Sequence, residues 1–468
     1  NTLTNDVTKL VEGSFLNFST TNPIYGINVI ENLLFWTDDR NQPRKININT
    51  ANGGAYYISE DLISVSKYNP YNVIELYYQD TAAETPYSTP AVPVPNPNVN
   101  QYVSSAQDVT SKFLPGSGTQ PNMYYDPNWP GDPDFLEDKF VTFSYRFRFE
   151  DGEYSIMAPF TQEAFIPKQD GYFLTGDEDS TYRSTIVQFM ENKVNNVGLY
   201  ITLPIDDLGN QITGETLKAK VGVEQIDIIY KESDSLTVKV LDSVSSRDFS
   251  RQADGSSNVN AFYLYDYQSR KPYKTLPESE IIRVYDKVPV RAFGQEVIGN
   301  RIVYSNFQNK HTPPSTIDYD VAVTAKEPFN ITGNKASWST SIIEYPEHTV
   351  KQNRNYQVGF VLSDRFGRTS TTILSPISTT LRTDPSTGVI YGGSTYYHPY
   401  APNLGAGLNK VNNFPGDSLK ILFNAPIGAN EIEGTNLQTG WPGLYNGDTT
   451  SSKYNPLGWY SYKIVVKQ

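Results

Sequence analysis

Strict alternation of aromatic and polar side chains is the feature that most constrains how this chain folds. From Lys139 to Ser155 the sequence reads KFVTFSYRFRFEDGEYS, and every second residue in its middle is aromatic. The aromatic set is Phe143, Tyr145, Phe147 and Phe149. Because successive side chains of a strand point to opposite faces of a sheet, this spacing predicts a β-strand with one aromatic face. Asp151-Gly152 predicts the following turn, since glycine tolerates the positive φ of a tight hairpin.

The same plan recurs later in the chain. The segment from Asn355 to Ser370 reads NYQVGFVLSDRFGRTS, with a turn expected at Asp364 to Gly367. Its apolar face is formed by Tyr356, Val358, Phe360 and Leu362. Trp459 to Val466 predicts a third such strand. Further strands are predicted at Gln225 to Tyr230, Leu236 to Val240, Ile281 to Tyr285 and Arg301 to Tyr304. We therefore expect an all-β chain.

One helix is expected among these strands. Between Thr181 and Val197 the apolar residues fall near i, i+3, i+4 and i+8, which forms one stripe along a helix. They are Ile186, Phe189, Met190 and Val194. Gly198 would cap this helix, and Leu199 to Leu203 would resume a strand. Its expected role is packing across a sheet.

Three long segments lack a regular pattern. Asp80 to Gly131 is rich in proline, which cannot donate to a sheet ladder, so loop or extended backbone is expected there. Tyr391 to Asp417 and Asn436 to Pro456 are two further irregular excursions. Loops of this length usually serve as functional surfaces, lids or docking arms.

Composition excludes several classes of protein. The 468 residues include no cysteine and three histidines, which excludes a disulfide scaffold, a zinc ribbon and a thiol nucleophile, and disfavours a His-rich metal centre. No apolar run reaches the roughly 18 residues that a membrane-spanning helix needs. The net charge of −13 disfavours general binding to nucleic-acid phosphates.

The two ends of the sequence carry an expectation of their own. The chain begins at Asn1 without a signal-like segment and ends in the strand-like stretch from Trp459 to Gln468. A terminal strand with an unpaired edge is uncommon in globular proteins. We therefore expect a piece of a longer polypeptide, with a trimmed form of the protein as the alternative.

Paired carboxylates follow one predicted strand, in LLFWTDDRNQPRKINI. Asp38 and Asp39 can cap turn amides, and Arg40 and Arg44 are their expected partners. Paired carboxylates also serve glycoside hydrolysis or cation binding. Because adjacent strand residues point in opposite directions, we favour a structural corner of a propeller blade, fixed by Trp36, Asp38 and Arg44.

Other candidate ligands give weaker signals. Acidic residues crowd two loops without the order of a calcium-binding loop, so solvated loops are favoured over Ca²⁺ sites. They are Asp126, Asp132, Asp134, Glu137 and Asp138, and then Asp177, Glu178 and Asp179. His311, His348 and His398 lie outside any HExxH or GxSxG motif and are expected on loops or at the surface.

Tyrosine pairs form the last candidate group. They are Tyr56-Tyr57, Tyr77-Tyr78, Tyr124-Tyr125 and Tyr396-Tyr397. Such rings can stack on sugars, but they serve equally well in cores and interfaces. The sequence has no P-loop and no dinucleotide-binding GxGxxG motif. We therefore predict no catalytic, cofactor-binding or metal-binding residue, and no cofactor.

Four segments together resemble a known family. They are LLFWTDDRNQPRKINI, FSYRFRFEDGEYS, RVYDKVPVRAFGQEVIGNRIVYSNF and the terminal GWYSYKIVVKQ. They resemble the muzzle or stabilisation protein of crAss-like bacteriophages, a large structural protein of the tail. The resemblance extends from about Leu33 to Gln468. It implies a place in the distal, nozzle-like end of a short tail, and it carries over no catalytic residue.

By analogy with other short-tailed phages, the resemblance implies β-propeller-like blades with inserted fibronectin- or immunoglobulin-like β-sandwich modules and long loops. The expected divisions are blades at 1–80, a Pro-rich arm at 81–135, a sandwich module with one helix at 136–245, blades at 246–330, and a second sandwich module at 331–468 that continues in a further segment. The expected core residues are Tyr145, Phe147 and Phe149 in the first sandwich and Tyr356, Val358 and Phe360 in the second.

These observations favour a non-enzymatic virion component, made in the cytoplasm of a bacterial host. It would form a homo-oligomeric ring, sixfold by analogy, and contact other tail proteins. The ring would hold and gate viral DNA during ejection without sequence-specific contact, and an acidic lining would keep phosphates from adhering. A cysteine-free chain suits assembly in a reducing cytoplasm.

Two other functions stay open. A secreted or cell-surface glycan-binding β-sandwich protein would line one concave face with exposed aromatic rings. A tail-associated glycoside hydrolase or depolymerase would place two carboxyl groups roughly 5–10 Å apart in a cleft.

Overall fold

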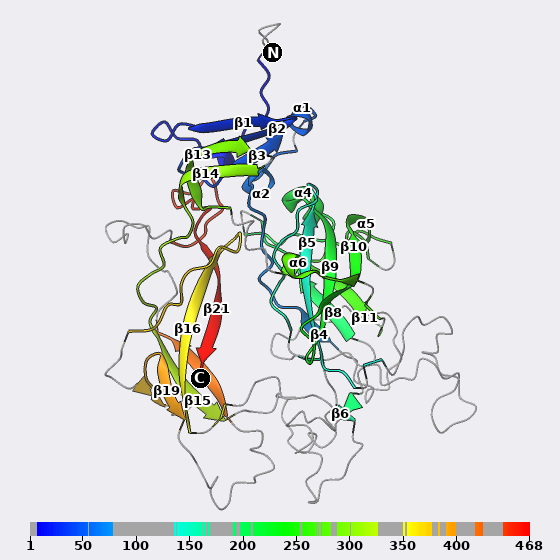
Figure 1. Cartoon of the computed structure of the whole chain (residues 1–468), viewed down its shortest axis with the longest axis vertical. Coiled ribbons are helices and arrows are strands. Elements are labelled where there is room, and N and C mark those ends of the chain that lie inside the picture. Colours follow the sequence, from blue (N-terminus) through cyan, green and yellow to red (C-terminus); the bar gives the residue numbers. More distant parts are fainter. Residues whose placement is uncertain are drawn as a thin grey trace, which may run out of the picture.

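The computed structural model consists mostly of β-strands in several small antiparallel sheets with few helices, which confirms the all-β prediction (Figure 1). The structure describes residues 7–54, 56–77, 135–136, 138–161, 163–164, 167–168, 191–192, 197–206, 209–252, 255–267, 269, 271–272, 274–281, 288–299, 301–325, 350–351, 353–376, 382–383, 390–398, 417–424 and 443–468. Within these ranges, no helix has both the length and the apolar character needed to span a membrane.

The N-terminal module joins two sheets from distant parts of the sequence. Its elements are η1 (Ser14–Leu16), β1 (Gly26–Ile30), β2 (Leu33–Thr37), β3 (Arg44–Asn47), α1 (Ile48–Asn52), α2 (Glu60–Ile63), β13 (Arg291–Ile298) and β14 (Arg301–Gln308). Strands β1, β2 and β3 form one sheet, and the β13–β14 hairpin packs beside it. The rings of Tyr25 and Phe293 stack at 4.0 Å, and the amide of Asp39 donates to the carbonyl of Ala292 at 3.0 Å.

The corner between β2 and β3 contains three buried polar residues, Asp38, Asn41 and Gln42. Asp38 accepts the amides of Arg40 and Asn41 at 3.1 and 2.8 Å, which confirms its predicted capping role. Trp36 lies in the apolar core of this module. Arg44 is also buried, but it pairs with a carboxylate outside the corner.

The central module consists of two sheets that share one apolar core. Its main elements are β4 (Glu75–Tyr77), β5 (Val141–Phe149), β8 (Val197–Thr202), α4 (Leu217–Val221), β9 (Val223–Glu232), β10 (Val238–Ser245), α5 (Ser246–Phe249), β11 (Phe262–Tyr267), β12 (Lys274–Thr275) and α6 (Glu278–Ile281). One sheet has the order β12-β10-β9-β5 and the other β11-β8-β4. A separate pair joins β6 (Pro167–Lys168) to β7 (Glu191–Asn192).

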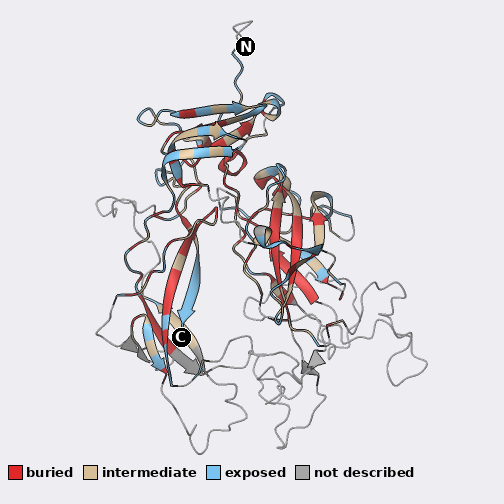
Figure 2. Cartoon of the chain, in the orientation of Figure 1, coloured by how far each residue is buried: buried red, intermediate tan, exposed pale blue. Residues whose placement is uncertain are grey.

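Alternation along β5 fills this core as predicted. Tyr145, Phe147 and Phe149 are all buried in it, together with β9 and β8 residues (Figure 2). The opposite face of β5 carries Arg146, which is buried against Asp227 of β9. The two-residue period therefore places rings in the core and two arginines, Arg146 and Arg148, on the other face.

The C-terminal module also has two facing sheets. Its elements are β15 (Tyr319–Ala325), β16 (Arg354–Asp364), β17 (Arg382–Thr383), β18 (Ile390–Tyr391), β19 (Thr395–His398), β20 (Asp417–Phe423) and β21 (Trp459–Lys467). The larger sheet has the order β19-β16-β21, and β15 pairs with β20. Val358 and Phe360 of β16 lie in its core as predicted, and Tyr356 is buried nearby.

The central and C-terminal modules follow the same local plan. In each, the long strand, β5 or β16, ends in a turn that contains a glycine at φ +81°, Gly152 or Gly367. L side chains rarely adopt this conformation, so both turns need glycine. Gly367 lies 215 positions after Gly152, and the same offset relates the other equivalent residues of β5 and β16.

A serine in the returning segment repeats with that offset. The hydroxyl of Ser155 accepts the amide of Phe147 at 2.9 Å and donates to the carbonyl of the next residue at 2.8 Å. The hydroxyl of Ser370 accepts the amide of Leu362 at 3.0 Å and donates to the next carbonyl at 2.6 Å. Both serines satisfy a buried backbone amide in the middle of a strand.

Strands β9 and β21 also occupy equivalent places. β9 pairs with β5 and β21 pairs with β16, both antiparallel. Each ladder has a register shift at the same point, between Arg148 and Phe149 in one case and between Ser363 and Asp364 in the other. The β5–β9 pair and the β16–β21 pair therefore follow the same strand arrangement.

The predicted helix is corrected at its C-terminal end. Glu191–Asn192 form strand β7, and Gly198, the predicted cap, lies inside β8. Pairing of β8 with both β4 and β11 outweighs the helical spacing there. Residues 181–190 and 193–196 lie outside the described residues.

Two boundaries also differ from the sequence prediction. Ile281 ends helix α6 instead of beginning a strand, while 282–285 lie outside the described residues. Thr395–His398 form β19 within a segment predicted to be irregular, because they pair with the start of β16. The proline-rich stretch from Asp80 to Gly131 lies outside the described residues.

Candidate functional site: a buried charge junction between the modules

Helix α2 carries two adjacent buried carboxylates, Glu60 and Asp61, which are 6% and 5% exposed. Burying a carboxylate is costly unless a cation and hydrogen bonds compensate for the lost water. Each of the two is paired with a buried arginine, and the two arginines come from different modules. We call this set of pairs the charge junction.

Glu60 ties α2 to the N-terminal sheet. Arg44 of β3 donates from Nη2 to Glu60 Oε2 at 2.6 Å, and Gln42 donates from Nε2 to Oε1 at 3.2 Å. The same guanidinium donates to the backbone carbonyls of Phe15 and Leu16. Burial raises the pKa of Glu60, and the charge of Arg44 opposes that rise.

Asp61 ties α2 to the C-terminal module. Arg365, in the turn after β16, donates from Nε to Asp61 Oδ1 at 3.1 Å and from Nη2 to Oδ2 at 2.7 Å. This two-point geometry fixes orientation as well as distance. Nη2 also donates to the carbonyl of Ile205 in the central module at 2.9 Å. One side chain therefore contacts all three modules.

Three tyrosine rings surround Arg365. Its guanidinium carbon lies 5.0 Å from the ring centroid of Tyr68, 5.2 Å from that of Tyr460 and 5.3 Å from that of Tyr445. Burial alone would lower the pKa of Arg365, but Asp61, Tyr445 and Tyr460 raise it, so the side chain stays charged. Cation–π attraction adds to the ion pair in this dry surrounding.

A second cluster extends the charge junction toward β15. Asp364, fully buried, accepts the amides of Phe366 and Arg368 and the Nε of Arg368 at 2.5 Å. Its Oδ2 also lies 3.2 Å from Nε2 of His311. Burial favours the neutral acid, but Arg368 and His311 together lower the pKa of Asp364.

Gln42 connects the two clusters. Its Oε1 accepts from Nη2 of Arg368 at 3.3 Å while its Nε2 donates to Glu60. Arg368 further donates from Nη1 to the carbonyl of Pro289 at 2.9 Å, next to the β13–β14 hairpin. The hydrogen-bonded network is therefore continuous from Arg44 to His311.

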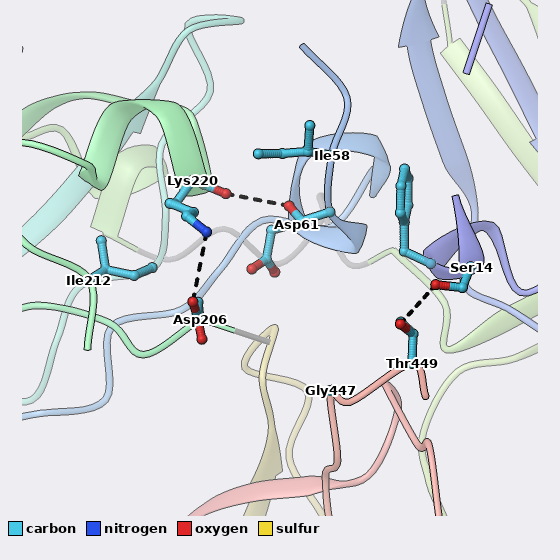
Figure 3. A pocket seen from close by; sticks show the side chains of 10 residues that line it. Ser14, Ile58, Asp61, Asp206, Ile212, Lys220, Gly447 and Thr449 are labelled. Carbon is cyan, nitrogen blue, oxygen red and sulfur yellow. Dashed lines mark hydrogen bonds and ion pairs between the residues drawn. The ribbon is translucent and has the colours of Figure 1, made fainter. Parts of the chain in front are cut away.

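A cavity of about 190 Å³ adjoins the charge junction (Figure 3). Its lining residues come from all three modules: Ser14, Phe15, Ile58, Ser59, Asp61, Asp206, Ile212, Lys220, Gly447 and Thr449. The hydroxyl of Ser14 donates to that of Thr449 at 2.8 Å across the cavity wall. Nζ of Lys220 lies 3.8 Å from Oδ2 of Asp206.

The charged groups around this cavity are engaged with one another. Arg365 donates one hydrogen bond to each carboxylate oxygen of Asp61. An ionised carboxylate accepts hydrogen bonds but has no proton to donate. Asp206 accepts the amide of Asn210 at 2.8 Å and faces Lys220. In the described part of the chain, no group of three or more His, Asp or Glu side chains gathers as metal ligation would require.

The hydrogen bonds and ion pairs of the charge junction fix the modules relative to one another.

The histidine prediction is wrong for His398, which lies in strand β19, and holds for His311 only in that it lies on a loop. His311 and His398 are 7% and 6% exposed instead of lying at the surface. His311 is buried against Asp364 and the ring of Trp459, 5.2 Å away, and burial lowers its pKa. His398 is placed in the sheet by the pairing of β19 with β16. His348 lies outside the described residues.

Those of the remaining candidate residues that the structure describes do not converge on one site. Asp38 and Asp39 shape the β2–β3 corner, and the rings of Tyr56 and Tyr57 meet edge to face at 4.9 Å. The acidic residues Asp126, Asp132, Asp134, Glu137, Asp177, Glu178 and Asp179 lie outside the described residues. The sequence offered no signal for the charge junction. Asp61 and Arg365 are 304 residues apart, and α2, with four residues, is too short to show a helical pattern of apolar residues.

Compared with known proteins, the chain matches no protein-family model and no curated protein.

Proposed function

We propose that the chain is a non-enzymatic structural subunit of a short bacteriophage tail, in its muzzle- or nozzle-like end. Copies of the chain form a ring, sixfold by analogy with other short tails, that contacts other tail proteins. The ring holds viral DNA and gates its ejection. On this proposal the protein resides in the virion.

The charge junction is the observation that carries this proposal. A subunit of a tube wall must keep its modules in fixed orientation while the tube is loaded. Arg365 contacts the modules through two hydrogen bonds to Asp61 and one to the carbonyl of Ile205. Removing one partner of such a buried pair is costly, so the modules resist separation.

The finer fold belongs to the same proposal. The sheet of β1, β2 and β3 and the β13–β14 hairpin are neighbouring propeller-like blades, stacked through Tyr25 and Phe293. The central and C-terminal modules are fibronectin- or immunoglobulin-like sandwiches, inserted between and after the blades. The net charge of −13 supports a lumen to which DNA phosphates do not adhere.

Electron microscopy of the purified protein tests the proposal. We expect class averages of closed rings with a central channel. Particles of a single 52.6 kDa chain at micromolar concentration would contradict it.

Two assays separate the alternatives. Release of reducing ends from bacterial surface polysaccharide would favour a depolymerase, and saturable binding to immobilised glycans by the monomer would favour a glycan-binding protein. We expect neither, because the carboxylates that line the cavity are engaged by cations.

A further inference from the structure

The C-terminal module exposes a row of apolar side chains that the central module buries. On β21, Tyr462, Ile464 and Val466 are 50%, 46% and 51% exposed. By register, their counterparts on β9 are Ile226, Ile228 and Tyr230, and all three are 0% exposed. Figure 2 shows β9 mostly as buried and most of β21 as exposed.

These side chains belong to the core face of their sheet. Ile464 pairs with Phe360, and Val466 pairs with Val358. Residues directly opposite in an antiparallel pair lie on the same face. Both partners on β16 are fully buried in the core of the module. The row on β21 therefore continues the core face but lacks part of its cover.

The central module shows what covers the equivalent row. Strand β10 pairs along the other edge of β9, and its Leu241 and Val244 enter the core. Strand β11 pairs in the same way with β8 in the facing sheet and contributes Tyr267. With both strands present, each core-facing residue of β9 and β8 is excluded from water.

Neither strand has a counterpart among the described residues of the C-terminal module. There, β21 pairs only with β16 along 461–467, and β20 pairs only with β15. Phe423 of β20 is 37% exposed, although it packs against Phe360 at 5.1 Å. Among its described residues, the module therefore repeats part of the central module without strands equivalent to β10 and β11.

We propose that the outer edge of β21 is a docking site for a β-strand supplied by another polypeptide, which takes the place of β10. Main-chain hydrogen bonds to the edge provide affinity, and alternate side chains provide specificity. This inference concerns one edge of the chain and does not rest on the proposed tail function.

The chemistry of the edge defines the partner strand. It runs antiparallel to β21, spans about eight residues as β10 does, and places apolar side chains beside Tyr462 and Ile464. Its opposite face carries carboxylates across from Lys463 and Lys467, because opposite charges in facing positions stabilise a strand pair. A second copy of β21 cannot supply these carboxylates, since Trp459–Lys467 contains two lysines and no acidic residue.

Hydrogen exchange with a designed peptide tests the proposal. The probe is a peptide of residues 238–245 that carries Val238→Glu and Ser243→Glu, the two positions that would face Lys467 and Lys463. In the free protein we expect amides of 461–467 to exchange faster than those of 225–231. About 1 mM peptide should slow exchange at 461–467 by about tenfold and leave 225–231 unchanged.

Two controls make the result specific. The same peptide with Val240→Pro should give no protection, because proline removes a ladder hydrogen bond. The protein variant K463E/K467E should lose the effect of the acidic peptide and regain it with lysines in place of the two glutamates.

Two results would overturn the inference. If 461–467 are already as protected as 225–231 in the free protein, residues of the same chain cover the edge. If the peptide and its lysine version both leave exchange unchanged, the edge does not accept a strand. Ring formation is measured separately, so either result leaves the proposed function to its own test.

Discussion

In the central module strand β9 is paired on both edges, by β5 and β10. In the described part of the C-terminal module, its counterpart β21 is paired along 461–467 on one edge, by β16. The two ladders agree in register, in the position of their register shift and in the serine that follows the turn. Side-chain type does not explain the different burial, because Ile228 and Ile464 are the same residue at equivalent positions. Burial at such a position is decided by the neighbouring strand.

The two modules also use buried arginines differently. In the central module Arg146 donates to Asp227 and to Glu280, both in the same module, and lies 3.9 Å over the ring of Tyr154. In the C-terminal module Arg365 is bound outside the module, by Asp61 of α2. The first arginine stabilises one unit, while the second holds units together.

The largest expected effect separates these two roles. Asp61→Ala should lower the free energy of unfolding by about 3–5 kcal/mol, because it leaves buried Arg365 without a carboxylate partner. Asp227→Ala should cost somewhat less, because Arg146 keeps its ion pair with Glu280. Asp227→Ala should unfold the central module, while Asp61→Ala should first separate the modules. Denaturant titration, combined with limited proteolysis between modules, measures both.

The matched control is Glu12→Ala. Glu12 pairs with Lys9 at the surface, where both side chains are mostly exposed, so its loss should leave stability nearly unchanged. If Asp61→Ala behaves like this control, Arg365 does not hold the modules together.

The next effect compares equivalent isoleucines. Ile228→Ala should cost about 2–5 kcal/mol, because it removes three carbons from a fully buried core position. Ile464→Ala should cost less than about 1 kcal/mol, since the side chain is 46% exposed. Thermal unfolding of the two variants side by side measures the difference. Equal losses would show that β21 is covered as fully as β9.

The serine variants should affect the two copies alike. Ser155→Ala and Ser370→Ala each leave one buried strand amide, of Phe147 or Leu362, without its hydroxyl acceptor. Each should cost about 1–3 kcal/mol. Ser19→Ala, in an exposed turn, serves as the control in the same denaturant titration. A loss in one module alone would break the equivalence of the two hairpins.

The smallest expected effect is a response of the central turn to acid. Burial opposes ionisation of Asp151, but Lys67 and Lys45 outweigh it and lower its pKa to about 2. The stabilisation is therefore complete above the ordinary pKa near 3.8 and is lost as the pH falls toward 2. After screening at this partly exposed site, it amounts to about 1–2 kcal/mol.

Asp151→Asn should remove this part of the acid response. Its counterpart at the C-terminal turn, Phe366, has no charge, so that turn lacks this contribution. Unfolding measured at pH 5 and at pH 2.5 for both proteins tests the sign. An acid response that is unchanged in Asp151→Asn would contradict the assignment.

The strands of the two repeated hairpins could be predicted from the sequence because their burial follows a local period. Phe147 and Phe360 occupy alternating positions that nothing but a strand explains. The ends of elements were less predictable: Gly198 reads as a helix cap but lies in β8, where neighbours on both edges decide its conformation.

The charge junction could not be predicted, because its partners are distant in sequence. Nothing in the sequence around Glu60 and Asp61 points to Arg44 and Arg365, which are brought against them only by the packing of separate modules. The burial of His311 could not be predicted for the same reason, since its carboxylate partner lies 53 residues away. Ion pairs between distant residues leave no regular spacing in the sequence, whereas the apolar face of a strand or helix does.

A cryo-electron microscopy map of the assembled oligomer tests the account most directly, because assembly and edge pairing are then seen together. The account predicts a closed ring in which the sheet of β16 and β21 continues into an added strand from another polypeptide, alongside residues 461–467. A solitary chain, or a ring in which that edge of β21 faces solvent, would contradict it.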